Sequence, residues 1–364
     1  MTARIVIGMF VVSSFWACGG DSVTTTEQPA LERGLHEVGV MTQPRLQHFA
    51  TLMQNGKVLI GGGYEEPLST RRISAEIFDP LTGSSSPTGN MTVSRSTDKG
   101  ILLADGRILI MPRYHDFPVE IYDPHSARFE ALAKIPWYPP ITTANLLQSG
   151  RIFVTTQQHA AVFDPAAGAF TSLVAMEETR KNHTSTLLKD GHVLIVGGST
   201  GNNELTGRNL IYHPSSNGFT EAGRLQVDRW GHTALLLHDG RVLILGGHTG
   251  SEQAILAEMY DTETDTFSPV GVAAISPLAA LLLPSGRVLL IHVPNGNIVL
   301  YNPDTHELSP TVYSIGPWRS GATVTLLEDN RVMIAGGWKY RDSSTQSGQG
   351  QEREMSDQIL IFAP

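Results

Sequence analysis

The chain has a single cysteine, Cys18, among its 364 residues. One thiol excludes an intrachain disulfide and any metal site built from several cysteine ligands. The chain also lacks a run of five or more lysine and arginine residues, and its net charge is −9. Both features argue against a nucleic-acid partner, which requires a basic surface. Beyond the N-terminus no apolar run reaches about 18 residues, so no membrane-spanning helix is predicted there.

The first residues are typical of an export signal. Arg4 precedes an apolar stretch, Ile5 to Trp16, that is too short to span a membrane. Small residues then surround Cys18, in an arrangement that resembles a bacterial lipoprotein signal and implies lipidation of that cysteine. We expect a signal peptide over residues 1–17 and a flexible tether over residues 18–34. An ordinary cleaved signal and an uncleaved anchor are the alternatives.

The lipoprotein resemblance also implies a location. We expect the protein in the cell envelope of a bacterium, at the outer membrane or cell surface, where it contacts the membrane only through its N-terminal lipid. Without lipidation, a secreted or periplasmic protein is expected.

The rest of the chain repeats one local pattern. It is clearest over residues 239–247, where a tight Asp-Gly turn leads into an apolar strand and a glycine doublet. The turn residue of each copy falls at Gly56, Gly106, Gly150, Gly191, Gly240, Gly286 and Asn330. Successive copies are therefore 41 to 50 residues apart. A period of this length, with four strand-like segments in each copy, is typical of propeller blades.

The four segments of each copy are called strands A to D here. Strand A precedes the turn and strand B follows it, and both are apolar runs that predict strands buried on two faces. Strand C ends in a signature such as Tyr122-Asp123-Pro124, in which the aspartate accepts local backbone hydrogen bonds. Strand D is marked by one large apolar residue in each of five copies: Phe129, Phe170, Phe219, Phe267 and Leu308.

These motifs, in this order, resemble the kelch repeat over about residues 35–364. The resemblance implies an all-β fold, a seven-bladed kelch-type β-propeller. The chain ends on a third strand at Phe362, and an orphan segment, Leu35 to Val40, stands at its beginning. We predict that this segment is the missing fourth strand, so that blade seven is closed by an N-terminal strand.

The two ends of the blades differ in their connections. The A–B and C–D turns are tight, whereas the B–C and D–A connections share the opposite end, called the loop face here. The four long B–C loops follow the four glycine doublets and cover residues 63–74, 199–209, 248–257 and 338–357. The other three blades carry Pro112-Arg113, Thr156-Gln157 and His292-Val293 instead of a doublet. Variable loops on a rigid scaffold favour binding, so a ligand is expected on the loop face.

An arginine recurs in five of the seven D–A connections: Arg45, Arg95, Arg180, Arg229 and Arg319. Pro139 and Ile275 occupy the other two copies. One hypothesis is a basic ring around the central mouth that binds carboxylate, sulfate or phosphate groups. The alternative is that each arginine pairs with a nearby acid and fixes the blades. The acids considered for this role are Asp98, Glu177, Glu178 and Asp228.

Aromatic residues lie beside these arginines. Trp230 and Trp318 adjoin two of them, and Trp338 and Tyr340 open the longest B–C loop. Exposed aromatic rings of this kind bind sugars or form protein-binding hot spots. The alternative is that they pack beneath the loops.

Two sets of titratable residues follow the repeat. His48, His183 and His232 share one repeat position at the start of strand A, and Glu76, Glu120 and Glu258 share one repeat position on strand C. A residue that follows a repeat is better explained by blade structure than by catalysis, so hydrogen bonds within the scaffold are expected. No spacing of histidines and carboxylates indicates a metal, and no cofactor is expected.

The leading functional hypothesis is a non-catalytic module that binds a protein or glycan ligand, which can be acidic. Some secreted kelch proteins are copper radical oxidases, but their cofactor needs a Cys–Tyr crosslink that this chain cannot form outside its signal region. Other kelch proteins epimerise sialic acid, and a similar carbohydrate-active enzyme is the alternative. Its acid and base would come from irregular loops that contain Asp116, Glu204, Glu252 and Asp342.

Overall fold

In the computed structural model the chain consists of strands and their connections. The structure describes residues 32–65, 70–96, 99–137, 140–171, 173–200, 204–250, 257–271, 277–292, 295–316, 319–340 and 353–364, and none of these is helical. Accordingly, the described residues include no helix that could cross a membrane. The predicted signal peptide and Cys18 lie outside the described residues, as does the predicted tether up to residue 31.

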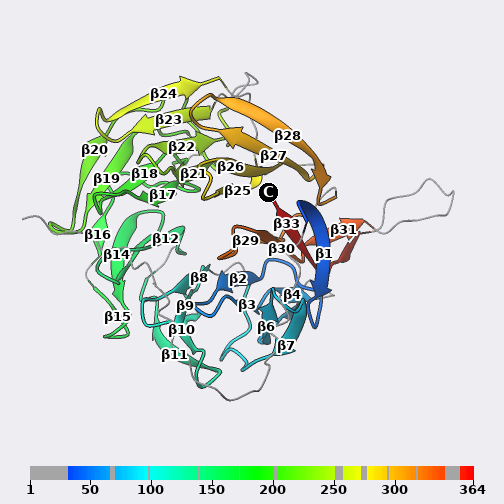
Figure 1. The fold of residues 1–364 in the computed structure, drawn as a ribbon. Helices are drawn as coiled ribbons and strands as arrows, with labels where there is room; N and C mark the ends of the chain where they lie inside the picture. Colours follow the sequence, from blue (N-terminus) through cyan, green and yellow to red (C-terminus); the bar gives the residue numbers. More distant parts are fainter. Residues whose placement is uncertain are drawn as a thin grey trace, which may run out of the picture. The chain divides into compact units, whose positions relative to one another are not determined.

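The strands form seven antiparallel sheets arranged as the blades of a β-propeller (Figure 1). Blade one consists of β2 (Phe49–Leu52), β3 (Val58–Gly61), β6 (Ala75–Asp79) and β7 (Ser84–Pro87). Blade two consists of β8 (Lys99–Leu102), β9 (Ile108–Met111), β10 (Pro118–Asp123) and β11 (Arg128–Lys134), and blade three of β12 (Thr143–Leu146), β13 (Ile152–Thr155), β14 (His159–Asp164), β15 (Ala169–Phe170) and β16 (Val174–Ala175). Blade four consists of β17 (Thr184–Leu187), β18 (Val193–Val196), β19 (Asn209–His213) and β20 (Gly218–Ala222).

Blades five to seven consist of β21 (Thr233–Leu236), β22 (Val242–Leu245), β23 (Ala257–Asp261) and β24 (Thr266–Val270); β25 (Pro277–Leu282), β26 (Val288–His292), β27 (Asn297–Asn302) and β28 (Glu307–Ser314); and β29 (Thr323–Leu326), β30 (Val332–Ala335), β33 (Gln358–Ala363) and β1 (Gly34–Val40). Two small hairpins occur in B–C loops: β4 (Tyr64–Glu65) with β5 (Thr70–Arg71), and β31 (Trp338–Tyr340) with β32 (Arg353–Met355). The described strands therefore confirm the predicted seven-bladed fold.

Burial differs between the two innermost strands of each blade. Strand B is buried at every residue in blades one to five and in blade seven, as predicted. Strand A is only half-buried, and every residue of β21 and β25 is of this kind. The prediction that strand A is buried on both faces was wrong. The A strands of most neighbouring blades contact one another, so they form the innermost layer of the ring, and no other described strand covers the side that faces its centre.

The aromatic signatures hold strands C and D together. Tyr122 of β10 lies opposite Phe129 of β11, with the ring centroids 4.7 Å apart. The same register places every predicted strand D marker opposite the aromatic residue that ends strand C. Asp123 Oδ1 accepts the backbone N–H of His125 at 2.8 Å, which confirms the local turn expected of this motif.

The N-terminal strand closes the ring. β1 pairs antiparallel with β33 through six residue pairs and forms the outer strand of blade seven. It begins at Gly34, one residue before the predicted start. Gly39 of β1 lies so close to blade one that a Cβ atom there would be 2.2 Å from the carbonyl oxygen of Gly83. The predicted closure of blade seven is confirmed, and β1 also packs against the neighbouring blade.

Candidate functional site

The five arginines of the D–A connections are buried, with at most 7% of their surface exposed. Three of them form buried ion pairs with the strand C glutamates. Arg45 Nε lies 2.9 Å from Glu76 Oε1, and Arg229 Nη2 lies 2.6 Å from Glu258 Oε1. Arg95 is paired with Glu120 in the same way. The hypothesis of a basic ring around the mouth is therefore not supported for these arginines, and their contacts match the alternative that they fix the blades.

The other two arginines have no glutamate at that slot, because strand C carries a leucine there. Arg180 donates instead to the carbonyl oxygen of Arg208, and Arg319 donates to the side chains of Ser356 and Gln358. Among the acids considered as partners, Glu178 lies 4.0 Å from Arg180 Nη2, and Asp98 lies outside the described residues.

The glycine doublets complete these links. The carbonyl oxygen of the first glycine accepts a hydrogen bond from the arginine of its own blade, as in Arg229 Nη1 to Gly246 at 3.1 Å. In three of the four doublets, the second glycine donates its N–H to the arginine carbonyl of the next blade, as in Gly63 to Arg95 at 2.8 Å. The bond from Gly337 to Arg45 spans blades seven and one, so this pattern also closes the ring.

The repeated histidines link neighbouring blades through threonine hydroxyls. His48 Nε2 lies 2.9 Å from Thr323 Oγ1, and His232 Nε2 lies 2.8 Å from Thr184 Oγ1. His183 Nε2 lies 2.7 Å from Thr155 Oγ1, on strand B of blade three. Burial, with a smaller contribution from the charge of the neighbouring arginine, lowers the pKa of each imidazole to about 3. The expected structural role is confirmed, and these histidines are neutral at neutral pH.

Acid should therefore destabilise the propeller. An unfolded histidine titrates near its ordinary pKa, whereas the folded one titrates near 3, so between these values only the unfolded state binds the proton. The contribution of each histidine to stability is therefore fully present above the pKa of the unfolded state, and it is lost as the pH falls below that value. At about pH 5 each buried histidine contributes a loss of about 2 kcal/mol relative to neutral pH.

His48→Gln tests this effect, because glutamine can bond Thr323 but cannot be protonated. In urea unfolding measured at neutral and at acidic pH, the variant should lose about 2 kcal/mol less than the natural protein on acidification. An equal loss in both proteins would contradict the role of His48.

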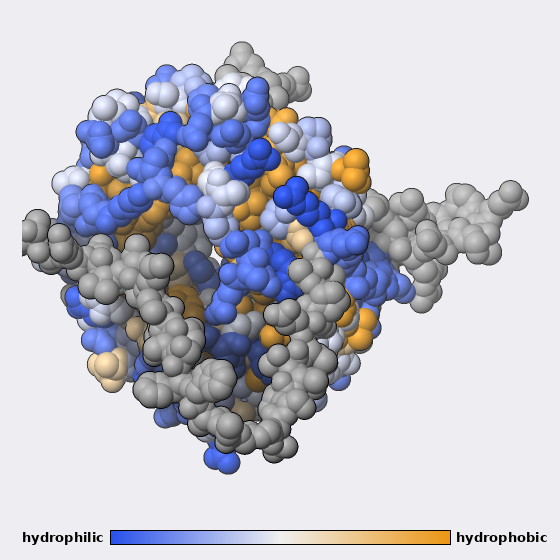
Figure 2. Space-filling view, in the orientation of Figure 1, coloured by the Kyte–Doolittle hydropathy of each residue, from blue (hydrophilic) through white to orange (hydrophobic). Residues whose placement is uncertain are grey.

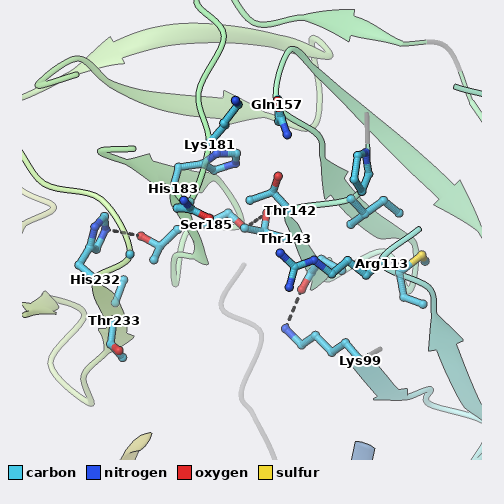
Figure 3. A pocket seen from close by; sticks show the side chains of 18 of the residues that line it. Lys99, Arg113, Thr142, Thr143, Gln157, Lys181, His183, Ser185, His232 and Thr233 are labelled. Carbon is cyan, nitrogen blue, oxygen red and sulfur yellow. Dashed lines mark hydrogen bonds between the residues drawn. The ribbon is translucent and has the colours of Figure 1, made fainter. Parts of the chain in front are cut away.

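A cavity of about 610 Å³ opens among the inner strands of blades two to five, on the loop face (Figure 3). In the space-filling view a hollow lies at the centre of the ring among largely hydrophilic residues (Figure 2). The polar and charged side chains of the cavity wall are Lys99, Arg113, Thr142, Thr143, Gln157, Lys181, Asn182, His183, Thr184, Ser185, His232 and Thr233. A volume of this size suits a small molecule or one or two sugar rings.

Departures from the repeat gather in this cavity. Lys99 begins strand A of blade two, where blades three, four, five and seven have threonine. Thr142 stands in the slot of the linking histidines, and Arg113 and Gln157 stand in the slot of the second doublet glycine. All four line the cavity at the junction of blades two and three. Residues that differ from the repeat pattern and lie together in space are the strongest candidates for a binding function, because blade structure does not explain them.

The cavity wall is positively charged. Lys99, Arg113 and Lys181 line it, and no aspartate or glutamate is among the lining residues that the structure describes. Lys99 Nζ donates to the carbonyl oxygen of Ala144 in blade three at 2.8 Å. The Lys99 side chain keeps exposed surface, yet it is surrounded by protein, and this desolvation lowers its pKa. Such an environment favours an anionic ligand.

An ordered row of polar side chains runs through blades three and four, and three of its members line the cavity. Hydrogen bonds join its five members in sequence: Asn145, Ser185, Thr143, Thr155 and His183. His183 Nδ1 lies 3.2 Å from the carbonyl oxygen of Arg180, which can only accept, so this nitrogen carries the proton. His183 Nε2 therefore accepts from Thr155, and every hydroxyl in the row donates toward His183. Thr143 and Ser185 keep lone pairs that can accept from ligand hydroxyl groups.

The predicted aromatic residues lie elsewhere. Trp230 stacks on His248, with the ring centroids 4.3 Å apart, and Trp338 is half-buried on the β31–β32 hairpin. Tyr340 belongs to the same hairpin, and Trp318 lies outside the described residues. Of the nine predicted binding residues, none that the structure describes lines the cavity.

The acids considered for catalysis do not meet in the cavity. Asp116 is exposed and pairs with His115, and Glu204 is also exposed. Glu252 and Asp342 lie outside the described residues. Within the described part of the chain, no group of three or more histidine, cysteine, aspartate and glutamate residues is placed to hold a metal.

Sequence reasoning missed the residues that line the cavity. Lys99 was not singled out, although its difference from the threonine of four other blades is visible once the copies are aligned on the turn glycine. Arg113 and Gln157 were noted only as a lost doublet. The cavity residues could therefore be found in the sequence from the positions at which a copy differs from the repeat, not from the repeated pattern itself.

No protein-family model matches the chain, and no curated protein matches it. Among solved structures, the fold is similar to that of a catalytically inactive virginiamycin B lyase from Staphylococcus aureus crystallised with quinupristin. The TM-score is 0.62 at 12% identity, over 91% of this chain and 99% of the lyase. A streptogramin B lyase gives a TM-score of 0.61 at 12% identity, over 90% of this chain and 96% of the other. At this identity the similarity concerns the fold.

Proposed function

We propose that the protein is an extracytoplasmic, kelch-type binding propeller that takes an acidic glycan into its central cavity without catalysing a reaction. The carrying observation is the cavity lined by Lys99, Arg113 and Lys181 with no carboxylate among its described lining residues. Carboxylate, sulfate and phosphate groups are held by such side chains. The hydroxyl row of Thr143 and Ser185 faces the same space and supplies acceptors for sugar hydroxyl groups.

Binding without catalysis is supported by the titratable groups of the cavity. Its two histidines, His183 and His232, have a pKa of about 3, and the Nε2 atom of each is hydrogen-bonded to a threonine hydroxyl. An epimerase requires a base and an acid within reach of one carbon atom. The described cavity wall offers no carboxylate for either role. Trp230 and Trp338 remain candidates to contact the outer part of a longer glycan.

The test is a titration with matched acidic and neutral sugars: glucuronate against glucose, and glucose 6-sulfate against glucose. The acidic member of each pair should bind, and binding should weaken as salt is added. The double variant Lys99→Gln, Arg113→Gln should lower affinity by at least about 100-fold, because each of the two lost charged contacts costs about 1.5–3 kcal/mol. Equal binding of acidic and neutral sugars would contradict an anion site.

A charge-matched control is available at the other end of the blades. Lys57 follows the A–B turn of blade one and Arg151 follows that of blade three. The variant Lys57→Gln, Arg151→Gln removes the same charge from a surface away from the cavity. It should bind acidic sugars as the natural protein does.

The proposed cellular location rests on the lipoprotein-like sequence around Cys18. We place the protein in the cell envelope, tethered by a lipid on Cys18. Labelled palmitate that enters the natural protein but not Cys18→Ala supports this anchor, and absence of label from the natural protein would reject it.

A further inference from the structure

Lys99 has no acid beside it among the described residues. The single hydrogen bond of its Nζ goes to a neutral acceptor, the carbonyl oxygen of Ala144. Lys57, by contrast, lies 3.0 Å from Asp79 Oδ2, and Lys339 lies 3.2 Å from Glu354 Oε1. A carbonyl oxygen stabilises an ammonium group less than a carboxylate does, so the charged form of Lys99 is held only weakly by its neighbours.

The cavity also supplies a second point of attachment. Strands β8 and β9 pair so that Lys99 lies opposite Met111, and Arg113 follows two residues later at the same end of blade two. Figure 3 shows the Lys99 and Arg113 side chains in the wall of one cavity. A guanidinium group binds a carboxylate with two parallel hydrogen bonds and cannot itself act as a nucleophile. The two residues can therefore divide their tasks, with Arg113 orienting an acid and Lys99 reaching its neighbouring atoms.

We propose that Lys99 forms a reversible imine with an oxo acid, a ligand that carries a carbonyl carbon as well as the carboxylate held by Arg113. Open-chain uronates and 2-oxo acids share this chemistry. The proposal rests on the proposed anion site and specifies what that site captures. Desolvation of Lys99 lowers its pKa and so raises the fraction of neutral amine that can attack.

The step is balanced without an oxidant or reductant. The lone pair of Nζ attacks the carbonyl carbon, and the carbonyl oxygen takes a proton as the carbinolamine forms. Loss of water then leaves a C=N bond, and hydrolysis returns the free amine and the oxo acid. The donors Thr142 and Gln157 line the same cavity and can hydrogen-bond the oxygen that leaves.

The experiment is reductive trapping of the natural protein with sodium cyanoborohydride and glyoxylate, pyruvate or glucuronate in turn. Hydride adds to the imine carbon and makes the adduct permanent, so that intact mass and peptide mapping locate it. One adduct at Lys99 is expected. It should be absent from Lys99→Arg, which keeps the charge, and unchanged in Lys57→Arg. Lactate, which has a carboxylate but no carbonyl, should compete and slow the labelling. The response to glyoxylate, pyruvate or glucuronate then distinguishes 2-oxo acids from open-chain uronates.

Each outcome separates the imine from the binding site. Adducts spread over surface lysines as readily as over Lys99 would overturn the proposal, and peptide mapping of the natural protein shows this even where a variant folds poorly. Binding of the acids, measured by thermal shift, without any adduct at Lys99 would overturn the imine and leave the anion site standing. If the acids neither bind nor label the protein, both proposals are wrong.

Discussion

A protein that lacks residues 1–40 should be less stable than one that lacks residues 1–31 by on the order of 5 kcal/mol. The longer deletion removes β1, which forms six residue pairs with β33 and buries Leu35 against the core of blades six and seven. Several backbone hydrogen bonds, at about 1 kcal/mol each, and one large apolar side chain are lost together. The shorter deletion is the matched control, because it removes the signal and tether but leaves β1 in place.

The longer deletion should also change association. Without β1, strand β33 becomes the edge of blade seven, and its apolar residues, Ile359 to Phe362, offer unpaired backbone groups to another chain. Urea unfolding and gel filtration measure both effects. Equal stability of the two truncated proteins would show that blade seven does not need its N-terminal strand.

Replacement of Arg229 by isoleucine should destabilise the propeller by about 3–5 kcal/mol, because Glu258 is left buried without its partner. The pair is closed to solvent, with side-chain exposures of 0% and 1%. Glu258 also accepts the backbone N–H groups of Gln226 and Val227, so its charge cannot move to water without breaking them.

The double variant Arg229→Ile, Glu258→Val should be more stable than Arg229→Ile alone, although it lacks the whole pair. Blade six has this combination naturally, with Ile275 and Val299 at the same repeat positions. Some loss should remain, because the carbonyl oxygen of Gly246 and the N–H of Gln226 lose their partners. A double variant no more stable than the single one in urea unfolding would show that the damage is not the uncompensated charge.

The fold was predictable from the sequence because its determinants are local. Each Asp-Gly turn, each apolar strand B and each aromatic–aspartate signature acts within about ten residues of chain, and seven copies in register leave little freedom for another topology. Even the closing strand followed from counting, since the last copy ends after strand C at Phe362. Strand A was misjudged because an apolar run does not reveal whether a neighbour covers both of its sides.

The burial of the arginines was harder to predict, because the sequence does not show whether an arginine near a channel mouth is buried or exposed. A signal was nonetheless present. Blades one, two and five combine the D–A arginine with a strand C glutamate, whereas blades three and six have neither. That joint occurrence indicates contact between the two slots. The cavity itself was not predictable, because Lys99 and Gln157 come together only through the pairing of blades two and three.

The most direct measurement of the central claim is a crystal structure of the natural protein grown with glucuronate. The expected result is a sugar in the cavity of blades two to five, with its carboxylate against Arg113 and Lys99 and its hydroxyl groups toward Thr143 and Ser185. A sugar bound only at the outer rim beside Trp230 or Trp338, or a cavity that stays empty at saturating glucuronate, would contradict it.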